Sequence, residues 1–308
     1  MNLKIFYNDL FECHEVPQGH PERKERIQSV NKLIKENYPQ LIKKIVPFDV
    51  DEYILKVHSI SYLKLIKSIS ETTDILKLDN DTFVSRGTYN AAKLGVCGSI
   101  LAVDHAMKKK NNSAFVCLRP PGHHAEPEKP MGFCIFSNAA IAAEYARFKY
   151  NLKCVAVLDF DVHHGNGTQA CFENKKDLLY FSSHEMPLFP GTGNKHEIGQ
   201  GNIFNFPLRP HSDGFEFLNA WSNHLLPKLF KLKPELVIIS AGFDAHKDDP
   251  ISSLNLTSHD FKKVTQDIMD YSIKFNNGKI LSLLEGGYNL KSLSDSLNEH
   301  LCVLSGKK

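Results

Sequence analysis

Four ionisable side chains gather in the segment 156–169, AVLDFDVHHGNGTQ: Asp159, Asp161, His163 and His164. The segment begins as an apolar run typical of a buried strand and ends in glycines. Residues spaced by two lie on one side of an extended strand, so Asp159, Asp161 and His163 are expected to share a side. His164 is expected on the other side or beyond the strand end. Asp161 and His163 could thus supply two ligands to one metal ion, which needs at least one more.

The best candidate for that third ligand is Asp244, in the segment SAGFDAH, because it is the acid nearest the end of another apolar run. Two carboxylates and one neutral histidine would nearly cancel a divalent charge and leave coordination positions open, as in catalytic sites. Without Asp244, a pair that merely hydrogen-bonds its loop would be an equally good interpretation. Asp159 would lie one pleat deeper, where it could orient a neighbouring histidine or hold a monovalent cation.

Two further segments carry side chains suited to hydrolysis. The segment RPPGHH contains His123 and His124, and a histidine near a metal-bound water can take its proton and later deliver it to a leaving amine. The segment LEGGYN places Tyr288 after two glycines, where its phenol could donate a hydrogen bond to a developing oxyanion. Each segment alone is compatible with an ordinary structural role. The segments indicate hydrolysis only if the fold brings them together.

The elements that would bring them together are alternating strands and helices. Strands are predicted at 3–7, 114–118, 154–162, 178–183, 236–242 and 280–287, and helices at 22–38, 85–110, 137–150, 213–232 and 257–275. The order predicts an α/β fold, in which a central, mostly parallel sheet has helices on both faces. Ligand sites of such folds lie at the carboxyl ends of the strands, and that is where the chemically suited segments fall.

Composition restricts the class of protein and its partners. The 308 residues include 37 Lys plus Arg and 35 Asp plus Glu, a formal charge of +2, which gives no reason to expect nucleic acid or an anionic membrane as partner. The first eight residues lack the features of a signal peptide, and no apolar run is long enough to span a bilayer. The seven cysteines are scattered, without a CxxC pair, and are interpreted as reduced, buried thiols of a cytoplasmic protein. No linker or repeat interrupts the chain, so residues 1–308 are expected to form one catalytic domain.

Taken together, these segments resemble the histone deacetylase superfamily, which includes acetylpolyamine amidohydrolases and acetoin-utilisation proteins. The matching stretches follow in order along nearly the whole chain: GHPERKERI, VHSISYL, RPPGHHAEPEKPMGFCIFSNAAIAA, LDFDVHHGNGTQ, FSSHEMPLFPGTG, SAGFDAHKDDP and LEGGYN. Their combination is highly specific. The resemblance implies a three-layer fold of the arginase–deacetylase type with one catalytic Zn²⁺ per chain.

The resemblance also assigns a role to each candidate residue. It makes Asp161, His163 and Asp244 the zinc ligands, Tyr288 the oxyanion donor, and His123 and His124 the catalytic pair, with His124 favoured as the proton shuttle. Residues that match the wall of a narrow acyl-lysine tunnel are Gly132, Phe133, Phe189 and Ile251. Those that match a structural K⁺ site are Asp159 and Ser182, with carbonyls of Asp161, His163 and Ser183. Arg26 matches a basic residue near an inner acetate pocket, and Asn166 matches the class II branch and its bacterial relatives.

The activity implied is hydrolysis of an acetyl or longer acyl group from the ε-amine of lysine in peptides or proteins. Acetylated polyamines are the alternative substrate. Polyamine-selective members tend to carry an acidic residue where this chain has Ile251, which favours lysine. The sequence does not distinguish Zn²⁺ from Fe²⁺, and it does not give the oligomeric state.

Two other functions compete with this one. A two-manganese ureohydrolase would need further carboxylates two positions after His163 and after Asp244, where this chain has Gly165 and His246. A catalytically silent acyl-lysine binder would need none of the chemical residues, yet every one is present.

Overall fold

Eight strands form one sheet at the centre of the molecule, and every pairing in it is parallel. The structure is a computed structural model that describes residues 1–71 and 74–306. The strands lie in the order β2-β1-β5-β10-β9-β6-β7-β8. Their bounds are β1 Asn2–Tyr7, β2 Ile42–Lys44, β5 Asn112–Val116, β6 Val155–Asp159, β7 Leu178–Glu185, β8 Ile203–Leu208, β9 Leu236–Ala241 and β10 Ile280–Leu284. A separate antiparallel pair joins β3 Leu76–Lys77 to β4 Phe83–Val84.

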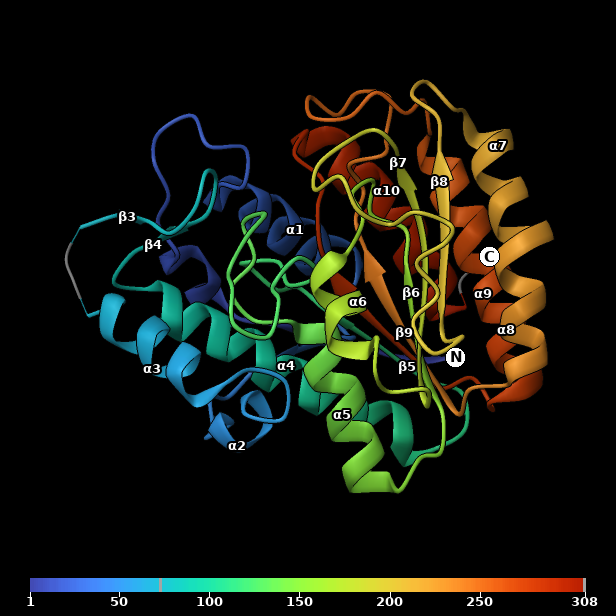
Figure 1. The fold of residues 1–308 in the computed structure, drawn as a ribbon, viewed down its shortest axis with the longest axis horizontal. Coiled ribbons are helices and arrows are strands. Elements are labelled where there is room, and N and C mark those ends of the chain that lie inside the picture. Colours follow the sequence, from blue (N-terminus) through green and yellow to red (C-terminus); the bar gives the residue numbers. More distant parts are fainter. Residues whose placement is uncertain (72–73, 307–308) are drawn as a thin grey trace.

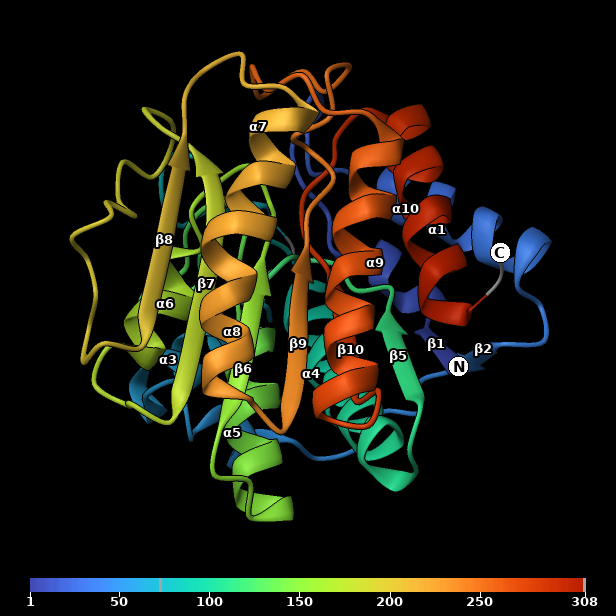
Figure 2. The same ribbon diagram turned by 90° about the vertical axis from the view of Figure 1, so that its right-hand side faces the viewer.

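Helices cover both faces of this sheet, with α7, α8, α9 and α10 on one face and α4 and α5 on the other (Figures 1 and 2). Their bounds are α1 Lys24–Asn37, α2 Asp51–Ile54, α3 Ile60–Ile69, α4 Thr88–Lys108, α5 Asn138–Tyr150, α6 Asn166–Phe172, α7 Gly214–Asn219, α8 Leu226–Leu232, α9 Ser258–Phe275 and α10 Leu290–Ser305. A π-helical segment, Ala220–Leu225, joins α7 to α8, and a 3₁₀ turn spans Asp9–Cys13. None of the described helices is long and apolar enough to cross a bilayer.

The three-layer α/β architecture predicted from the sequence is therefore confirmed. Every residue of β5, β6, β9 and β10 is buried, which explains their nearly continuous apolar sequences. Because all eight strands run in one direction, their carboxyl ends meet at one edge of the sheet. That edge receives the loops that carry the chemically suited residues.

Several elements were not predicted. The edge strands β2 and β8 carry polar residues and, in β8, Pro207, and neither has the apolar sequence of the central strands. Helix α10 was not predicted either, although its leucines have helical spacing. The prediction that the cysteines are buried is correct for Cys97, Cys117, Cys134 and Cys171 and wrong for Cys13, which is exposed at the end of the 3₁₀ turn.

One buried histidine connects the helical layer to the sheet. His300 of α10 is fully buried, and its Nδ1 lies 2.7 Å from Thr265 Oγ1 of α9 while its Nε2 lies 2.8 Å from Ser282 Oγ of β10. Burial lowers the pKa of His300 to about 3. The folded chain therefore holds this ring neutral at neutral and mildly acidic pH.

The buried ring leads to an expected pH dependence of stability. The folded-state pKa of His300 lies below its unfolded value. Its contribution to the free energy of unfolding is therefore fully present above about pH 6.5 and is lost as the pH falls. Between pH 7 and pH 5 the loss is about 2 kcal/mol. In His300→Gln, denaturant titrations should show a free energy of unfolding that falls by about 2 kcal/mol less over this interval. The loss of packing in the variant lowers its free energy of unfolding at pH 7 as well. The test therefore compares how steeply the free energy of unfolding changes with pH in the variant and in the wild type. Equal slopes would contradict the prediction.

Candidate active site

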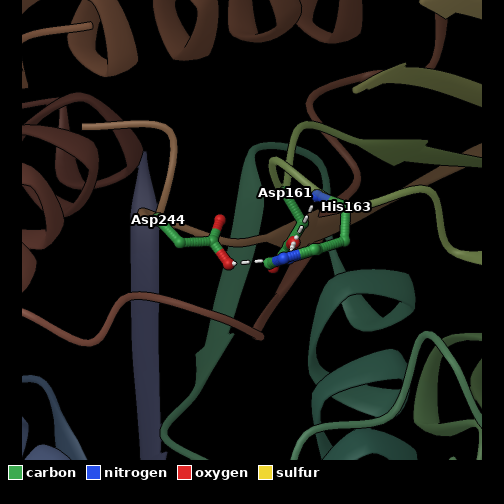
Figure 3. A group of neighbouring side chains, drawn as sticks. All are labelled: Asp161, His163 and Asp244. Carbon is green, nitrogen blue, oxygen red and sulfur yellow. Dashed lines mark hydrogen bonds and ion pairs between the residues drawn. The ribbon is translucent and has the colours of Figure 1, made fainter. Parts of the chain in front are cut away.

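Three buried ligand groups meet where β6 and β9 end side by side (Figure 3). Asp161 and His163 follow β6, and Asp244 follows β9. Their ligand atoms all lie within 4.8 Å of one another. His163 Nδ1 lies 3.1 Å from Asp161 Oδ1 and 3.2 Å from Asp244 Oδ2. The three residues predicted as metal ligands are thus together in the structure.

The backbone reaches this arrangement in a different way from the one predicted. Strand β6 ends at Asp159, so Asp161 and His163 do not lie on an extended strand, and the predicted strand 154–162 is too long. The Asp161 N–H donates to Asp159 Oδ1 at 3.2 Å, and the His163 N–H donates to Asp161 Oδ1 at 2.9 Å. These aspartate side chains therefore turn the chain out of the sheet locally.

The residues fit a divalent cation. Backbone donors hold both oxygens of Asp161 and one oxygen of Asp244: Gly286 N–H lies 2.9 Å from Asp161 Oδ2, His163 N–H lies 2.9 Å from Asp161 Oδ1, and Val162 N–H lies 2.9 Å from Asp244 Oδ1. The other oxygen of Asp244 is buried, faces the His163 ring and makes no hydrogen bond. A buried anionic oxygen without a donor is costly, and a cation between the three groups would compensate it.

Glycines leave room for these carboxylates. A Cβ atom at Gly286 would lie 2.0 Å from Asp244 Oδ2, and one at Gly242 would lie 2.0 Å from Asp161 Oδ2. Any other residue at either position would displace a carboxylate. The two glycines are therefore needed for the position of the ligands, although neither contributes a ligand.

The electrostatics of the group also favour a positive charge at its centre. Burial alone would lower the pKa of His163, but the hydrogen bond to Asp161 and the charges of Asp161 and Asp244 raise it to about 10. Burial would raise the pKa of Asp161, yet the charge of His123 and the hydrogen bond to His163 lower it. Without a metal ion, a proton on His163 therefore takes the place of the cation.

The two histidines of the loop after β5 differ in their partners. His123 Nδ1 lies 3.1 Å from Asp159 Oδ2, and the hydroxyl of Tyr180 donates to that same oxygen at 2.9 Å. His124 Nδ1 lies 2.8 Å from Asn166 Oδ1. One histidine is paired with a carboxylate and the other with a neutral amide.

These partners give the two rings opposite protonation. Burial would lower the pKa of His123, but the charges of Asp161 and Asp159 raise it well above its usual value. Burial lowers the pKa of His124, and the charges of His123 and His163 lower it further. His124 is therefore the neutral member of the pair.

The tautomer of His124 follows from its neighbours. The amide nitrogen of Asn166 donates to Glu126 Oε1 at 2.7 Å, so the Asn166 oxygen faces His124 and accepts its Nδ1–H. The unshared electron pair of His124 is then on Nε2. Glu126 therefore orients the Asn166 amide and, through it, the His124 ring.

A cavity of about 240 Å³ opens above these residues. The four predicted tunnel residues, Gly132, Phe133, Phe189 and Ile251, all line it, together with Asp81, Leu188, His124, His163 and Tyr288. The ring of Phe133 meets that of Tyr288 edge-on at 5.7 Å between centroids, and the rings of Phe189 and His124 meet edge-on at 5.1 Å. A larger cavity of about 640 Å³ lies beside Cys13, Arg86 and Lys93, but it lacks a comparable group of metal ligands and bases. The smaller cavity is therefore the candidate active site because of the residues that line it, not because of its volume.

Arg26 lies behind Tyr288 and does not line this cavity. Its guanidinium carbon is 4.8 Å from the centroid of the Tyr288 ring, and its Nε and Nη2 donate to the carbonyls of Gly287 and Glu285, each at 2.6 Å. Glu22 accepts from both Arg26 and Arg119, so the buried cations are compensated. The role near an acetate pocket stays a prediction; the contacts show an anchor for residues 285–287.

The predicted K⁺ site is already supplied with hydrogen bonds. Asp159 accepts from Asp161 N–H, from His123 and from Tyr180, while Ser182 Oγ lies 2.8 Å from His184 Nδ1. The contacts assign Asp159 the orienting role, and the cation stays a prediction.

Two residues important for the geometry were missed. Tyr180 holds Asp159, and the fully buried Glu285 accepts the N–H groups of Gly122 at 2.7 Å and His123 at 3.2 Å. For Glu285 a signal exists: it is an acid at the end of an apolar strand in LLEGG. A tyrosine within an apolar strand, such as Tyr180, gives no comparable signal.

Comparisons with known proteins agree with this site. Residues 20–304 match the histone deacetylase domain, and the chain belongs to that family, as its motifs indicated. It is similar to an uncharacterized protein of Synechocystis sp., 39% identical over 305 residues that cover 97% of this chain and 98% of that one. It also resembles the histone deacetylase-like amidohydrolase of Pseudomonas aeruginosa, 34% identical over 279 residues, or 88% of this chain and 73% of that one.

A solved structure supports the same assignment. The HD domain of HDA15 superposes with a TM-score of 0.93 and 31% identity, over 99% of this chain and 88% of that one. The family assignment establishes a deacetylase or amidohydrolase fold and class for this chain.

Proposed function

We propose that the chain is a Zn²⁺-dependent deacetylase that hydrolyses the amide of acylated lysine side chains in peptides or proteins. The observation that carries this proposal is the convergence of His124, His163 and Tyr288 on one narrow, aromatic-walled cavity, with Asp161 and Asp244 beside His163. Only one such metal-binding group occurs within residues 1–71 and 74–306. We therefore propose one metal ion per chain rather than two.

The chemistry is divided among the residues around the cavity. The metal ion, when bound to Asp161, His163 and Asp244, would act as a Lewis acid and lower the pKa of a water to about 7. His124 is neutral, with its free Nε2, and is suited to take a proton from water and pass it to the leaving amine. Tyr288 is suited to donate to the oxyanion, and Phe133 and Phe189 to hold the apolar alkyl chain and exclude water.

Acetylated polyamines are a second candidate substrate class, because Asp81 lines the cavity. A carboxylate there could pair with the distal ammonium of a polyamine. Against this, Ile251 in the same cavity wall is apolar, and Glu126 is half-buried, bound by Asn166 and not part of that wall. We therefore favour acyl-lysine.

The test is acetate release from an acetyl-lysine peptide and from acetylputrescine, with and without a chelator. Chelator-sensitive release from the peptide supports the proposal, whereas a preference for acetylputrescine that Asp81→Asn abolishes would move the assignment to polyamines. If longer acyl chains are removed faster than acetyl, only the acyl preference changes. Absence of release from any acylated amine would overturn the proposal in favour of a silent binder.

A further inference from the structure

The position of Tyr288 depends on the peptide bond between Gly287 and Tyr288. Two consecutive glycines precede the tyrosine, and Gly287 has a φ of +118°, a conformation that only glycine adopts without strain. Glycines give this stretch little conformational preference of its own. Something else must therefore fix the direction in which the phenol leaves the backbone.

Two buried side chains, a guanidinium and a carboxyl group, hold the two ends of that peptide group. On the carbonyl side, Arg26 Nε donates to Gly287 O at 2.6 Å. On the amide side, Tyr288 N–H donates to Asp249 Oδ2 at 2.7 Å, and Asn289 N–H donates to the same oxygen at 3.2 Å. Arg26 and Asp249 are both buried, so water competes little with these hydrogen bonds, and burial together with the charge of Asp244 raises the pKa of Asp249 to about 7.

Asp249 is itself fixed relative to the metal ligands. It lies five residues after Asp244, and its Oδ1 accepts from the N–H of Ile251, a wall residue of the cavity, at 3.3 Å. Ser252 Oγ donates to the carbonyl of Asp244 at 2.5 Å, and Ser253 donates from its N–H to Glu185 at the end of β7. The segment 249–253 therefore connects the ligand group, the cavity wall and Tyr288.

We propose that Asp249 is a positioning residue, which, together with Arg26, clamps the Gly287–Tyr288 peptide and sets the phenol in place relative to the metal ligands. The proposal deepens the proposed function, because it assumes that Tyr288 serves as the oxyanion donor. Asp249 does not line the cavity and would act only through the tyrosine. A displacement of about 1 Å at such a donor is enough to lower turnover about 100-fold.

A double-mutant cycle separates this role from a general structural one. Asp249→Asn should lower kcat on the acetyl-lysine peptide about 10- to 100-fold with KM changed less than about threefold. In a Tyr288→Phe background, the same substitution should lower kcat by no more than about twofold, because the donor it positions is gone. If the decreases in kcat of the two single variants multiply in the double variant, the proposal is overturned. Asp248→Asn, whose side chain is 60% exposed, is the control and should leave both constants unchanged.

Hydrogen exchange tests the clamp without any substrate. In Asp249→Asn the Tyr288 amide should exchange at least about tenfold faster, while Asp248→Asn leaves it unchanged. If the wild-type chain hydrolyses neither amine, the proposed function fails, but the exchange rate still decides whether the clamp exists. If Asp249→Asn does not fold, Arg26→Lys is used instead, because it perturbs the same peptide group from its carbonyl side. The double-mutant cycle then combines Arg26→Lys with Tyr288→Phe. Unchanged exchange and a kcat within twofold of wild type would overturn the proposal.

Discussion

Asp244→Asn is expected to abolish stable metal binding and to lower kcat/KM about 1000-fold or more. The substitution removes one of two anionic ligands, and the backbone N–H of Val162 would retain the amide oxygen at the Oδ1 position. The amide nitrogen, a donor, would then face His163 and the metal. Loss of the metal removes several kcal/mol of transition-state stabilisation, which corresponds to the expected decrease.

Metal content and thermal stability check this expectation independently of turnover. Wild-type protein should contain about one metal ion per chain by elemental analysis, and its Tm should rise when metal is added back to the chelated protein. Asp244→Asn should show neither effect, and Asp248→Asn should show both. Retention of one tightly bound metal ion by Asp244→Asn would refute the ligand assignment.

His124→Ala is expected to lower kcat about 1000-fold with the metal content unchanged, because a positioned general base contributes about 100- to 10,000-fold. His124 touches the cavity but is not a member of the ligand group, so metal binding and catalysis should separate in this variant. Added imidazole should restore part of the turnover, because it can enter the space left by the ring. A kcat within tenfold of the wild type would assign the base to another residue.

Asn166→Asp refines the same prediction. In the wild-type chain the His124 ring lies 2.8 Å from the neutral amide oxygen of Asn166. A carboxylate at the same place would raise the pKa of the ring. A larger fraction of His124 is then protonated at neutral pH, so the rise of kcat/KM with pH should shift to higher pH. An unchanged profile would mean that His124 does not titrate as the base.

The residues predicted for the site lie together in the structure, because their positions depend on a general property of parallel sheets. His123, Asp161 and Asp244 each follow an apolar strand, and the loops at the carboxyl ends of such strands meet at one edge. The local backbone was predicted less well. Side-chain acceptors on Asp159 and Asp161 bind N–H groups two residues ahead, and this ends β6 at Asp159. Such local bonds compete with strand pairing, and hydrophobic patterns do not reveal them.

The residues that hold the site in place were harder to predict than those that do chemistry. Glu285, Tyr180 and Asp249 act through hydrogen bonds to segments 21 to 163 residues away in the chain. Nothing in the spacing of a single sequence pairs such distant positions. Arg26 illustrates the same limit, because its contacts with the carbonyls of 285 and 287 became visible only in the folded chain.

The place of β10 in the sheet has a consequence for biosynthesis. Among the strands it is the last to be made, yet it lies in the interior, between β5 and β9. Until it inserts, a nascent chain exposes two long, apolar, unpaired strand edges to the crowded surroundings of the ribosome. Gly286, which supports both metal-binding carboxylates, follows that same strand. The surroundings of Asp161, His163 and Asp244 are therefore complete only after β10 and the glycines that follow it have been made.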